Sequence, residues 1–316
     1  MSEAPPPLIS VVICTYNRAD LLADVLRTLV CQTLSPDRFE IIIVDNNSKD
    51  ATQGVCSSII AENPDLPIRY VLEPRQGLSH ARNRGWREAR GEYVGYVDDD
   101  CRVPPEWLEN AEEVVKRVQP TAFGGPYYAF YTSPKPAWFK KEYCTHVQGS
   151  EARPLQDGEY LDGANIFIRK NILKTLDGFN PDLGMSGDKI AYGEETALLL
   201  NIRKKILGAL IYYDPKLHVY HLVPPQKMLL SWNARSRFIN GRYASRVFNS
   251  RNSQNKNVIK KFLHGVVLIG ILVLDLTIGT IFRDRSRYPC FQNYYYERSF
   301  QYIEGLGACW GYIFEN

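Results

Sequence analysis

Three consecutive aspartates, Asp98, Asp99 and Asp100, directly follow the hydrophobic run YVGYV at residues 93–97. Carboxylates held this close together repel one another unless a positive charge lies between them. A divalent cation that also binds substrate phosphates meets this need, because hard cations take carboxylate and phosphate oxygens together. The alternative is a solvated acidic turn before a helix that begins near Pro105. A buried strand that directs the triplet to one edge of a sheet favours the metal site.

Several other motifs of phosphate and metal chemistry do not occur. The first hydrophobic run is not followed by GxGxxG, and there is no GKS or GKT loop, which disfavours a dehydrogenase or a P-loop enzyme. The 7 cysteines are scattered and never spaced as CxxC, so neither a disulfide framework nor a zinc cluster is indicated. With 45% hydrophobic residues and a formal charge of +3, the 316-residue chain has the composition of a globular protein with ample core material.

The elements that would position the aspartates alternate along the first 120 residues. Hydrophobic runs predict buried strands at residues 8–14, 40–44, 68–72 and 93–97, and helical patterns lie between them at residues 19–32, 51–62 and 79–90. This alternation predicts an α/β fold with a mostly parallel sheet covered by helices. Ligands of such sheets bind beyond the carboxyl ends of the strands, and the polar clusters at residues 15–18, 45–47 and 98–100 fall at those ends.

Five segments together resemble glycosyltransferase family 2, in order from about residue 8 to about residue 240. They are SVVICTYNR at 10–18, VDNNSKD at 44–50, QGLSHARNRG at 76–85, YVDDD at 96–100 and GEETALLLNIRK at 193–204. The resemblance implies a GT-A fold, with a Rossmann-like central sheet flanked by helices. It also implies sugar transfer from a nucleotide-diphosphate sugar with inversion. The catalytic domain would span residues 1–230, with a nucleotide-binding half over about 8–120 and an acceptor half over about 121–230.

Matched position by position, the resemblance implies a donor pocket beyond the first strands. Its residues would be Thr15, Asn17, Arg18, Asp45, Arg82, Asn83, Asp98 and Asp99. Asp45 would accept a hydrogen bond from the imide N–H of the base, which favours uridine or thymidine, and Arg82 and Asn83 would approach the ribose and diphosphate. Asp98 or Asp99 would lie nearer the ribose. The residues after the second strand are also good turn formers, and helical arginines are often simply solvated.

The implied cofactor is Mn2+ or Mg2+, held by the family's DxD motif. Its ligands would be Asp100 and Asp98, with Asp100 the direct contact, and His221 in the segment VYHLVPP would complete the site. A lone histidine such as His221 can equally have a purely structural role.

A second acidic pair, Glu194 and Glu195, lies about 95 residues beyond the first cluster. In the family this position often reads Glu-Asp, and the second residue deprotonates the acceptor hydroxyl. The resemblance therefore implies Glu195 as the catalytic base, with Glu194 beside it, although glutamate in place of aspartate adds one methylene of reach. The alternative is an acidic first helical turn that the helix dipole favours.

Residues 231–316 form a basic extension with 12 Lys/Arg and 5 Asp/Glu. Within it, the apolar run at 262–282 is long enough to span a bilayer. Asp275 inside the run would cost about 2.5–3.5 kcal/mol at the membrane centre, and basic residues flank both ends, so no orientation is favoured. We therefore predict a helix that lies at an anionic membrane surface. A helix buried on the catalytic domain is the alternative.

The combined prediction is a metal-dependent, inverting glycosyltransferase on the cytoplasmic face of a membrane. Its partners would be a nucleotide-sugar donor, a glycan or lipid-linked acceptor and the membrane surface, and no nucleic acid. If the apolar helix is buried, the protein would be cytoplasmic. A metal-dependent phosphohydrolase or nucleotidyltransferase would also use clustered aspartates, and a non-catalytic sugar-nucleotide-binding protein is a third class. The second acidic pair, Glu194 and Glu195, argues against a non-catalytic binding protein.

Overall fold

The computed structural model describes residues 5–187, 189–248 and 258–315. The chain divides into two compact units, each assembled from several segments. The sheet unit consists of Met1–Phe130, Cys144–Asp182 and Glu194–Leu222, and the helical unit consists of Tyr131–Tyr143, Leu183–Gly193 and Val223–Asn316. Two segments from the middle of the chain therefore belong with the C-terminal helices.

The sheet unit is built on an eight-stranded sheet in the order β3-β2-β1-β4-β9-β6-β10-β8. Strands β1 to β4 are mutually parallel, and they are the strands that the hydrophobic runs predict. The bounds of the eight strands are β1 Ile9–Thr15, β2 Phe39–Asp45, β3 Ile68–Leu72, β4 Tyr93–Val97, β6 Ala122–Gly124, β8 Arg153–Pro154, β9 Asn165–Arg169 and β10 Ile211–Tyr213.

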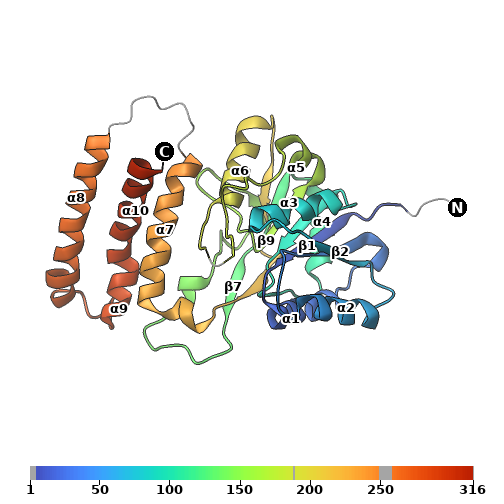
Figure 1. The fold of residues 1–316 in the computed structure, drawn as a ribbon, viewed down its shortest axis with the longest axis horizontal. Helices are drawn as coiled ribbons and strands as arrows, with labels where there is room; N and C mark the ends of the chain where they lie inside the picture. The colour runs from blue at the N-terminus through green and yellow to red at the C-terminus, as the bar shows by residue number, and fades with distance from the viewer. Residues whose placement is uncertain (1–4, 188, 249–257, 316) are drawn as a thin grey trace. The chain divides into compact units, whose positions relative to one another are not determined.

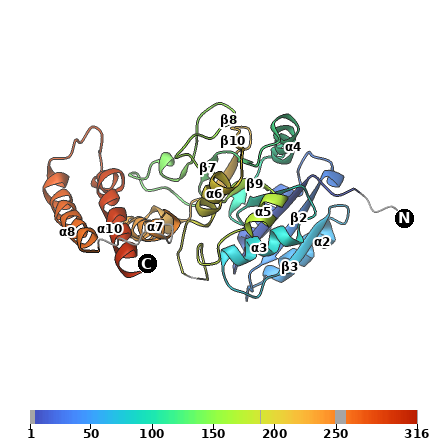
Figure 2. The same cartoon turned by 90° about the horizontal axis from the view of Figure 1, so that it is seen from above.

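Helices cover both faces of this sheet (Figures 1 and 2). Alternate side chains of β1 point to opposite faces, so Ile9, Val11 and Ile13 join one hydrophobic cluster and Val12 joins the other. The first cluster is completed by α1 Ala19–Leu29, α2 Thr52–Glu62 and α4 Trp107–Val118. The second is completed by α3 Leu78–Glu88, α5 Lys170–Leu176 and α6 Glu194–Lys205.

The second half of the sheet adds antiparallel pairs to the parallel strands that the sequence predicts. Strand β9 runs antiparallel to both β4 and β6, so the complete sheet is mixed. Because β9 is antiparallel, its first residue pairs with the last residue of β4, Asn165 with Val97. A second, three-stranded sheet joins β5 Cys101–Arg102, β11 Val219–Leu222 and β7 Tyr127–Phe130. The antiparallel strand β9 and the three-stranded sheet each bring residues of the acceptor half to the end of β4.

The helical unit contains three long helices that lie side by side (Figure 1). They are α7 Leu230–Phe248, α8 Val258–Leu274 and α10 Phe300–Phe314, and the short α9 Phe291–Tyr294 precedes α10. A π-helical turn, Asp275–Gly279, extends α8, and a second one, Tyr295–Ser299, links α9 to α10. Single 3-10 turns occur at Pro36–Arg38, Lys141–Cys144 and Pro225–Met228.

Helices α7 and α10 pack with their backbones in contact. A Cβ atom on Gly241 would lie 1.9 Å from the carbonyl oxygen of Glu304, and one on Gly307 would lie 1.9 Å from that of Phe238. Small residues permit such close approach of two helices, as in membrane helix pairs. The glycines therefore fix the spacing within the helical unit.

Helix α8 carries the apolar run, and its side chains are mostly exposed. Val258–Gly279 is long and apolar enough to cross a membrane, and within α8 itself only Leu268 is buried. Asp275 accepts hydrogen bonds from the Tyr294 hydroxyl at 2.5 Å and the Ser299 hydroxyl at 2.6 Å, so its charge is partly satisfied within the unit.

The helical unit has less unpaired positive charge than its sequence suggests. Arg237 pairs with Glu304 at 3.1 Å, and Arg242 and Arg246 both pair with Glu315, so three basic side chains of α7 have partners within the unit. Two further basic residues of this segment, at positions 251 and 256, lie outside the described residues. The basic residues that flank the apolar run are Lys260, Lys261, Arg283, Arg285 and Arg287.

Candidate active site

The candidate site begins where β1 and β4 end. These strands are neighbours, and the chain leaves β1 toward β2 on one side and β4 on the other, so the strand order reverses between them. Ligands of open α/β sheets bind beyond the carboxyl ends of the strands at such a point. The aspartates that follow β4 therefore face the residues that follow β1.

Asp99 accepts hydrogen bonds from the last residue of β1 and from the loop that follows it. The Thr15 hydroxyl donates to Asp99 Oδ2 at 2.8 Å, and Arg18 Nη1 donates to Asp99 Oδ1 at 2.9 Å. Arg18 also lies 3.4 Å from Asp100 Oδ2. Burial raises the pKa of Asp99 to about 7, and the nearby charge of Asp100 adds to the rise while Arg18 opposes it. Arg18 keeps 44% of its side chain exposed, so it remains accessible to an anionic ligand.

Asn17 and Asp45 hold the loop after β2 against the end of β1. Asn17 adopts a left-handed backbone with φ 52°, its amide N–H donates to the Ser48 hydroxyl, and its side-chain oxygen accepts from the Lys49 amide. Asp45 accepts from the Ser48 amide at 2.8 Å and from the Tyr70 hydroxyl at 2.7 Å. Each carboxylate oxygen of Asp45 accepts one hydrogen bond and has the capacity to accept another. Recognition of a base by Asp45 stays a prediction.

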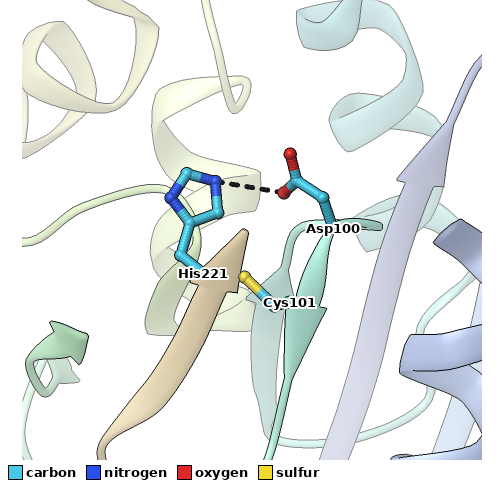
Figure 3. Close-up of side chains that lie close together, drawn as sticks. All are labelled: Asp100, Cys101 and His221. Atoms are coloured by element: carbon cyan, nitrogen blue, oxygen red, sulfur yellow. Dashed lines mark ion pairs between the residues drawn. The ribbon is translucent and has the colours of Figure 1, made fainter. Parts of the chain in front are cut away.

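Asp100 and His221 come together although they are far apart in the sequence (Figure 3). His221 Nε2 lies 3.0 Å from Asp100 Oδ1, because β11 pairs with the short strand β5 that begins directly after Asp100. Two ligands that occupy neighbouring positions around an octahedral ion with bonds of about 2.1 Å lie about 3 Å apart. A carboxylate suits Mn2+ and Mg2+, and an imidazole is a common ligand of first-row transition metal ions. The donor set therefore fits the expected ion. Asp98, the other predicted ligand, accepts from Arg82 Nη2 at 3.5 Å, and its role as a metal ligand stays a prediction.

Arg82 connects the two acidic clusters. Arg82 is 3% exposed as a residue. Its Nη1 lies 2.9 Å from Glu194 Oε1 and 3.8 Å from Glu195 Oε2, and its Nη2 lies 3.5 Å from Asp98 Oδ1. Gly163 leaves the space for it, since a Cβ atom there would lie 2.4 Å from Arg82 Nη2. Removing a charge from water is costly unless it is paired, and Arg82 is paired with three carboxylates.

Glu195 is the carboxylate of this group that keeps a buried oxygen without a hydrogen bond. Its Oε2 has no hydrogen-bond partner among the described residues, whereas Glu194 accepts directly from Arg82. Burial raises the pKa of Glu195 well above its ordinary value, and the charge of Glu194 adds to the rise while Arg82 lowers it. A general base is most effective when its pKa lies near the working pH.

Asn83 is not brought into this group. Its amide N–H donates to the Phe179 carbonyl at 2.7 Å, and its oxygen accepts from the Phe179 amide and the Trp86 indole. The side chain therefore anchors α3 to the chain after α5, and direct contact with ribose or diphosphate stays a prediction.

Sequence reasoning missed Asp162, which lies close to both clusters. Its negative charge raises the pKa of Glu195, after burial and Glu194, and it also acts on Asp98. Asp162 accepts from the Ala164 amide at 3.0 Å and precedes β9. The segment DGAN carries no local signal for this, because Asp162 is placed at the end of β4 by the antiparallel pairing of β9 with β4.

Curated relatives cover most of the chain. A glucosyl-dolichyl phosphate glucuronosyltransferase of Haloferax volcanii is 24% identical over 275 residues, which is 84% of this chain and 84% of that protein. The succinoglycan biosynthesis protein ExoM of Rhizobium meliloti is 28% identical over 244 residues, or 76% of this chain and 74% of that protein.

Solved structures show the same fold. A mannosyltransferase from Pyrobaculum calidifontis, solved with GDP-Man and Mn2+, superposes with a TM-score of 0.59 at 19% identity, covering 96% of this chain and 73% of that one. S. aureus TarS residues 1–349, solved with UDP, superpose with a TM-score of 0.55 at 17% identity, covering 95% of this chain and 89% of that one. The α/β fold predicted from the sequence is therefore confirmed as the GT-A fold.

The family model for glycosyl transferase family 2 matches residues 10–176, more than half of the chain. The matched span contains all of β1 except Ile9, the polar clusters at residues 15–18 and 45–47, the aspartate triplet and Arg82. The chain is therefore a glycosyltransferase and belongs to glycosyl transferase family 2.

Proposed function

We propose that this protein transfers a sugar from a nucleotide-diphosphate sugar to a hydroxyl of a glycan or lipid-linked acceptor, with inversion and with Mn2+ or Mg2+ as cofactor. One observation carries the proposal. Arg82 bridges the donor-side Asp98 and the pair Glu194 and Glu195, so the two acidic clusters form one constellation. A donor held beside the first cluster would then present its sugar to the second.

The donor side suits a nucleoside diphosphate. Arg18 offers an accessible guanidinium, and Asp100 with His221 would hold the ion. When bound, Mn2+ or Mg2+ would neutralise charge on the diphosphate. The fold relatives were solved with GDP-Man and with UDP, so both base types occur on this fold. For this chain a UDP- or dTDP-linked donor is favoured, because Asp45 would accept the imide N–H of uracil or thymine.

The acceptor side suits a single displacement. A sugar hydroxyl does not lose its proton near pH 7 unaided, and Glu195 would take that proton as the hydroxyl oxygen bonds to the anomeric carbon. The bond from the anomeric carbon to the phosphate oxygen breaks at the same time, and the nucleoside diphosphate leaves with the electron pair. One displacement inverts the anomeric centre. Retention by double displacement would need a carboxylate nucleophile at that carbon.

We further propose that the helical unit attaches the enzyme to the cytoplasmic face of a membrane. The exposed apolar side chains of α8 include Phe262, Val266 and Ile269, and basic residues flank the apolar run. Such a helix favours the boundary between headgroups and acyl chains. The Haloferax volcanii relative is named for a dolichyl phosphate substrate, which supports a lipid-linked acceptor here as well.

A panel of nucleotide sugars with Mn2+ tests the proposed reaction. We expect release of a nucleoside diphosphate from one donor, abolished by EDTA and by Asp100→Asn, because both remove the ion. An Asp37→Asn variant provides the control, since Asp37 is an exposed carboxylate away from the site. Release of inorganic phosphate or pyrophosphate instead would identify a phosphohydrolase or nucleotidyltransferase. Full activity in EDTA would contradict the metal requirement.

A further inference from the structure

We propose that Cys101 is a third side-chain ligand at the Asp100–His221 site for soft divalent cations, so that Zn2+ or Cd2+ binds there more tightly than Mn2+ and inhibits the enzyme. This inference rests on the proposed function, because it requires the metal site. It goes beyond that function by naming a ligand, a class of inhibitor and a selectivity.

The geometry comes from the three-stranded sheet. Cys101 of β5 is directly opposite His221 of β11 in an antiparallel pair. Directly opposite residues project from the same face of a sheet with Cβ atoms about 4.5–5.5 Å apart. The thiol sulfur, a ring nitrogen of His221 and a carboxylate oxygen of Asp100 all lie within 4.8 Å of one another (Figure 3). The three donors therefore surround one volume.

The distances are close to those of a coordinated ion. Sulfur and nitrogen bound to one tetrahedral zinc, with bonds of about 2.3 and 2.0 Å, lie about 3.5 Å apart. Donor atoms that already lie within 4.8 Å need only small side-chain movements to reach that separation. Cys101 is 1% exposed, so its thiol is held in place by the core around it. The pairing of β5 with β11 places this sulfur beside the two ligand atoms.

The chemistry of the donors predicts discrimination between ions. Hard Mn2+ and Mg2+ prefer oxygen ligands and would leave the thiol protonated. Soft ions favour thiolate, so Zn2+ or Cd2+ would form a bond to sulfur while the thiol proton is released to solvent. Three protein ligands leave a tetrahedral ion one open position. A diphosphate that needs two positions is then poorly bound, which gives inhibition.

Co2+ is a suitable probe, because a cobalt–thiolate bond gives an intense charge-transfer band in the near ultraviolet. We expect the full-length protein titrated with Co2+ to develop this band, and Cys101→Ser to bind Co2+ without it. Cys56→Ser is the matched control, since Cys56 is also a buried free cysteine but lies in α2, and it should keep the band. We also expect Cys101→Ser to weaken Cd2+ binding by at least about tenfold, with little effect on Mn2+ binding.

Displacement of Mn2+, followed by its electron paramagnetic resonance signal, reports binding at the same site. Wild-type protein in which Co2+ displaces Mn2+ without a charge-transfer band would overturn the role of Cys101 and leave the metal site intact. Protein that binds neither ion, with no change in Asp100→Asn, would overturn the metal site and this inference together. The wild-type spectrum decides the question even if Cys101→Ser fails to fold.

Discussion

At the scale of single residues, two adjacent glutamates have different surroundings. Glu194 accepts a hydrogen bond from Arg82 at 2.9 Å, whereas Glu195 Oε2 lies 3.8 Å from the same guanidinium and is buried without a hydrogen bond among the described residues. A carboxylate oxygen that already accepts a close, charge-assisted hydrogen bond is a poorer proton acceptor than one that accepts none. The structure therefore gives a physical reason to choose Glu195, where the sequence offers only a family resemblance and an altered side chain.

Replacing each glutamate separately tests this choice. Glu195→Gln keeps the size of the side chain and removes its basicity, so turnover should fall about 10²–10⁴-fold with little change in donor binding. Glu194→Gln should cost clearly less, because its amide oxygen still accepts from Arg82. Steady-state kinetics and donor titration measure both effects. The reverse order of losses would make Glu194 the base, and losses of only a few-fold in both would place the base elsewhere.

The pH dependence of turnover gives a second test at this scale. Glu195 must be deprotonated to act as a base, and burial together with the charge of Glu194 raises its pKa. Activity should therefore fall as the pH is lowered, with a midpoint well above the ordinary glutamate pKa of about 4.3. Glu194→Gln removes a like charge beside Glu195 and should shift this limb to lower pH. Profiles of kcat/KM for the two proteins provide the measurement. A shift to higher pH in the variant would contradict the assignment.

At the scale of elements, the first half of the fold could be predicted from the sequence and the second half only in part. Strands β1 to β4 are continuous hydrophobic runs separated by amphipathic helices, so their period identifies them. The partner of strand β9, β4, lies about 70 residues earlier in the chain, so no local pattern reveals that β9 is antiparallel. Asp162 was missed for the same reason, because its nearness to Asp98 follows from that pairing.

The same antiparallel arrangement makes Gly163 a sensitive position. Gly163→Ala would bring a Cβ atom to 2.4 Å from Arg82 Nη2, and a buried guanidinium has little room to move away. We expect a large loss of turnover with a cooperative fold retained, measured by kinetics and thermal unfolding. Gly54→Ala in α2 is the control, since nothing lies within 4 Å of a Cβ there and alanine favours helix. Normal activity in Gly163→Ala would show that the position of Arg82 is unimportant.

At the scale of the whole molecule, the apolar surface of α8 should determine where the enzyme works. Phe262 and Val266 are 59% and 51% exposed and lie one turn apart on the same face. We expect the protein to sediment with anionic vesicles and to be partly released by salt, because surface charge is screened over about 8–10 Å at physiological ionic strength. Since three arginines of α7 are paired within the helical unit, the apolar contribution should dominate.

A double variant, Phe262→Asp with Val266→Asp, should lose vesicle binding while it keeps its thermal stability, since both side chains are exposed. Leu207→Asp is the control, because Leu207 is a fully exposed apolar residue of the sheet unit and should not contribute. Unchanged sedimentation of the double variant would remove the membrane role of α8.

The stereochemistry of the reaction distinguishes a single from a double displacement, and its measurement needs no knowledge of the acceptor. With water as a slow acceptor, the enzyme should release free sugar from its donor, and proton nuclear magnetic resonance can identify the first anomer before mutarotation. One base and a single displacement predict an initial anomer opposite to that of the donor, so an α-linked nucleotide sugar should yield the β-sugar first. Initial release of the α-sugar would contradict the account, because retention requires a nucleophile or a pathway that this constellation does not supply.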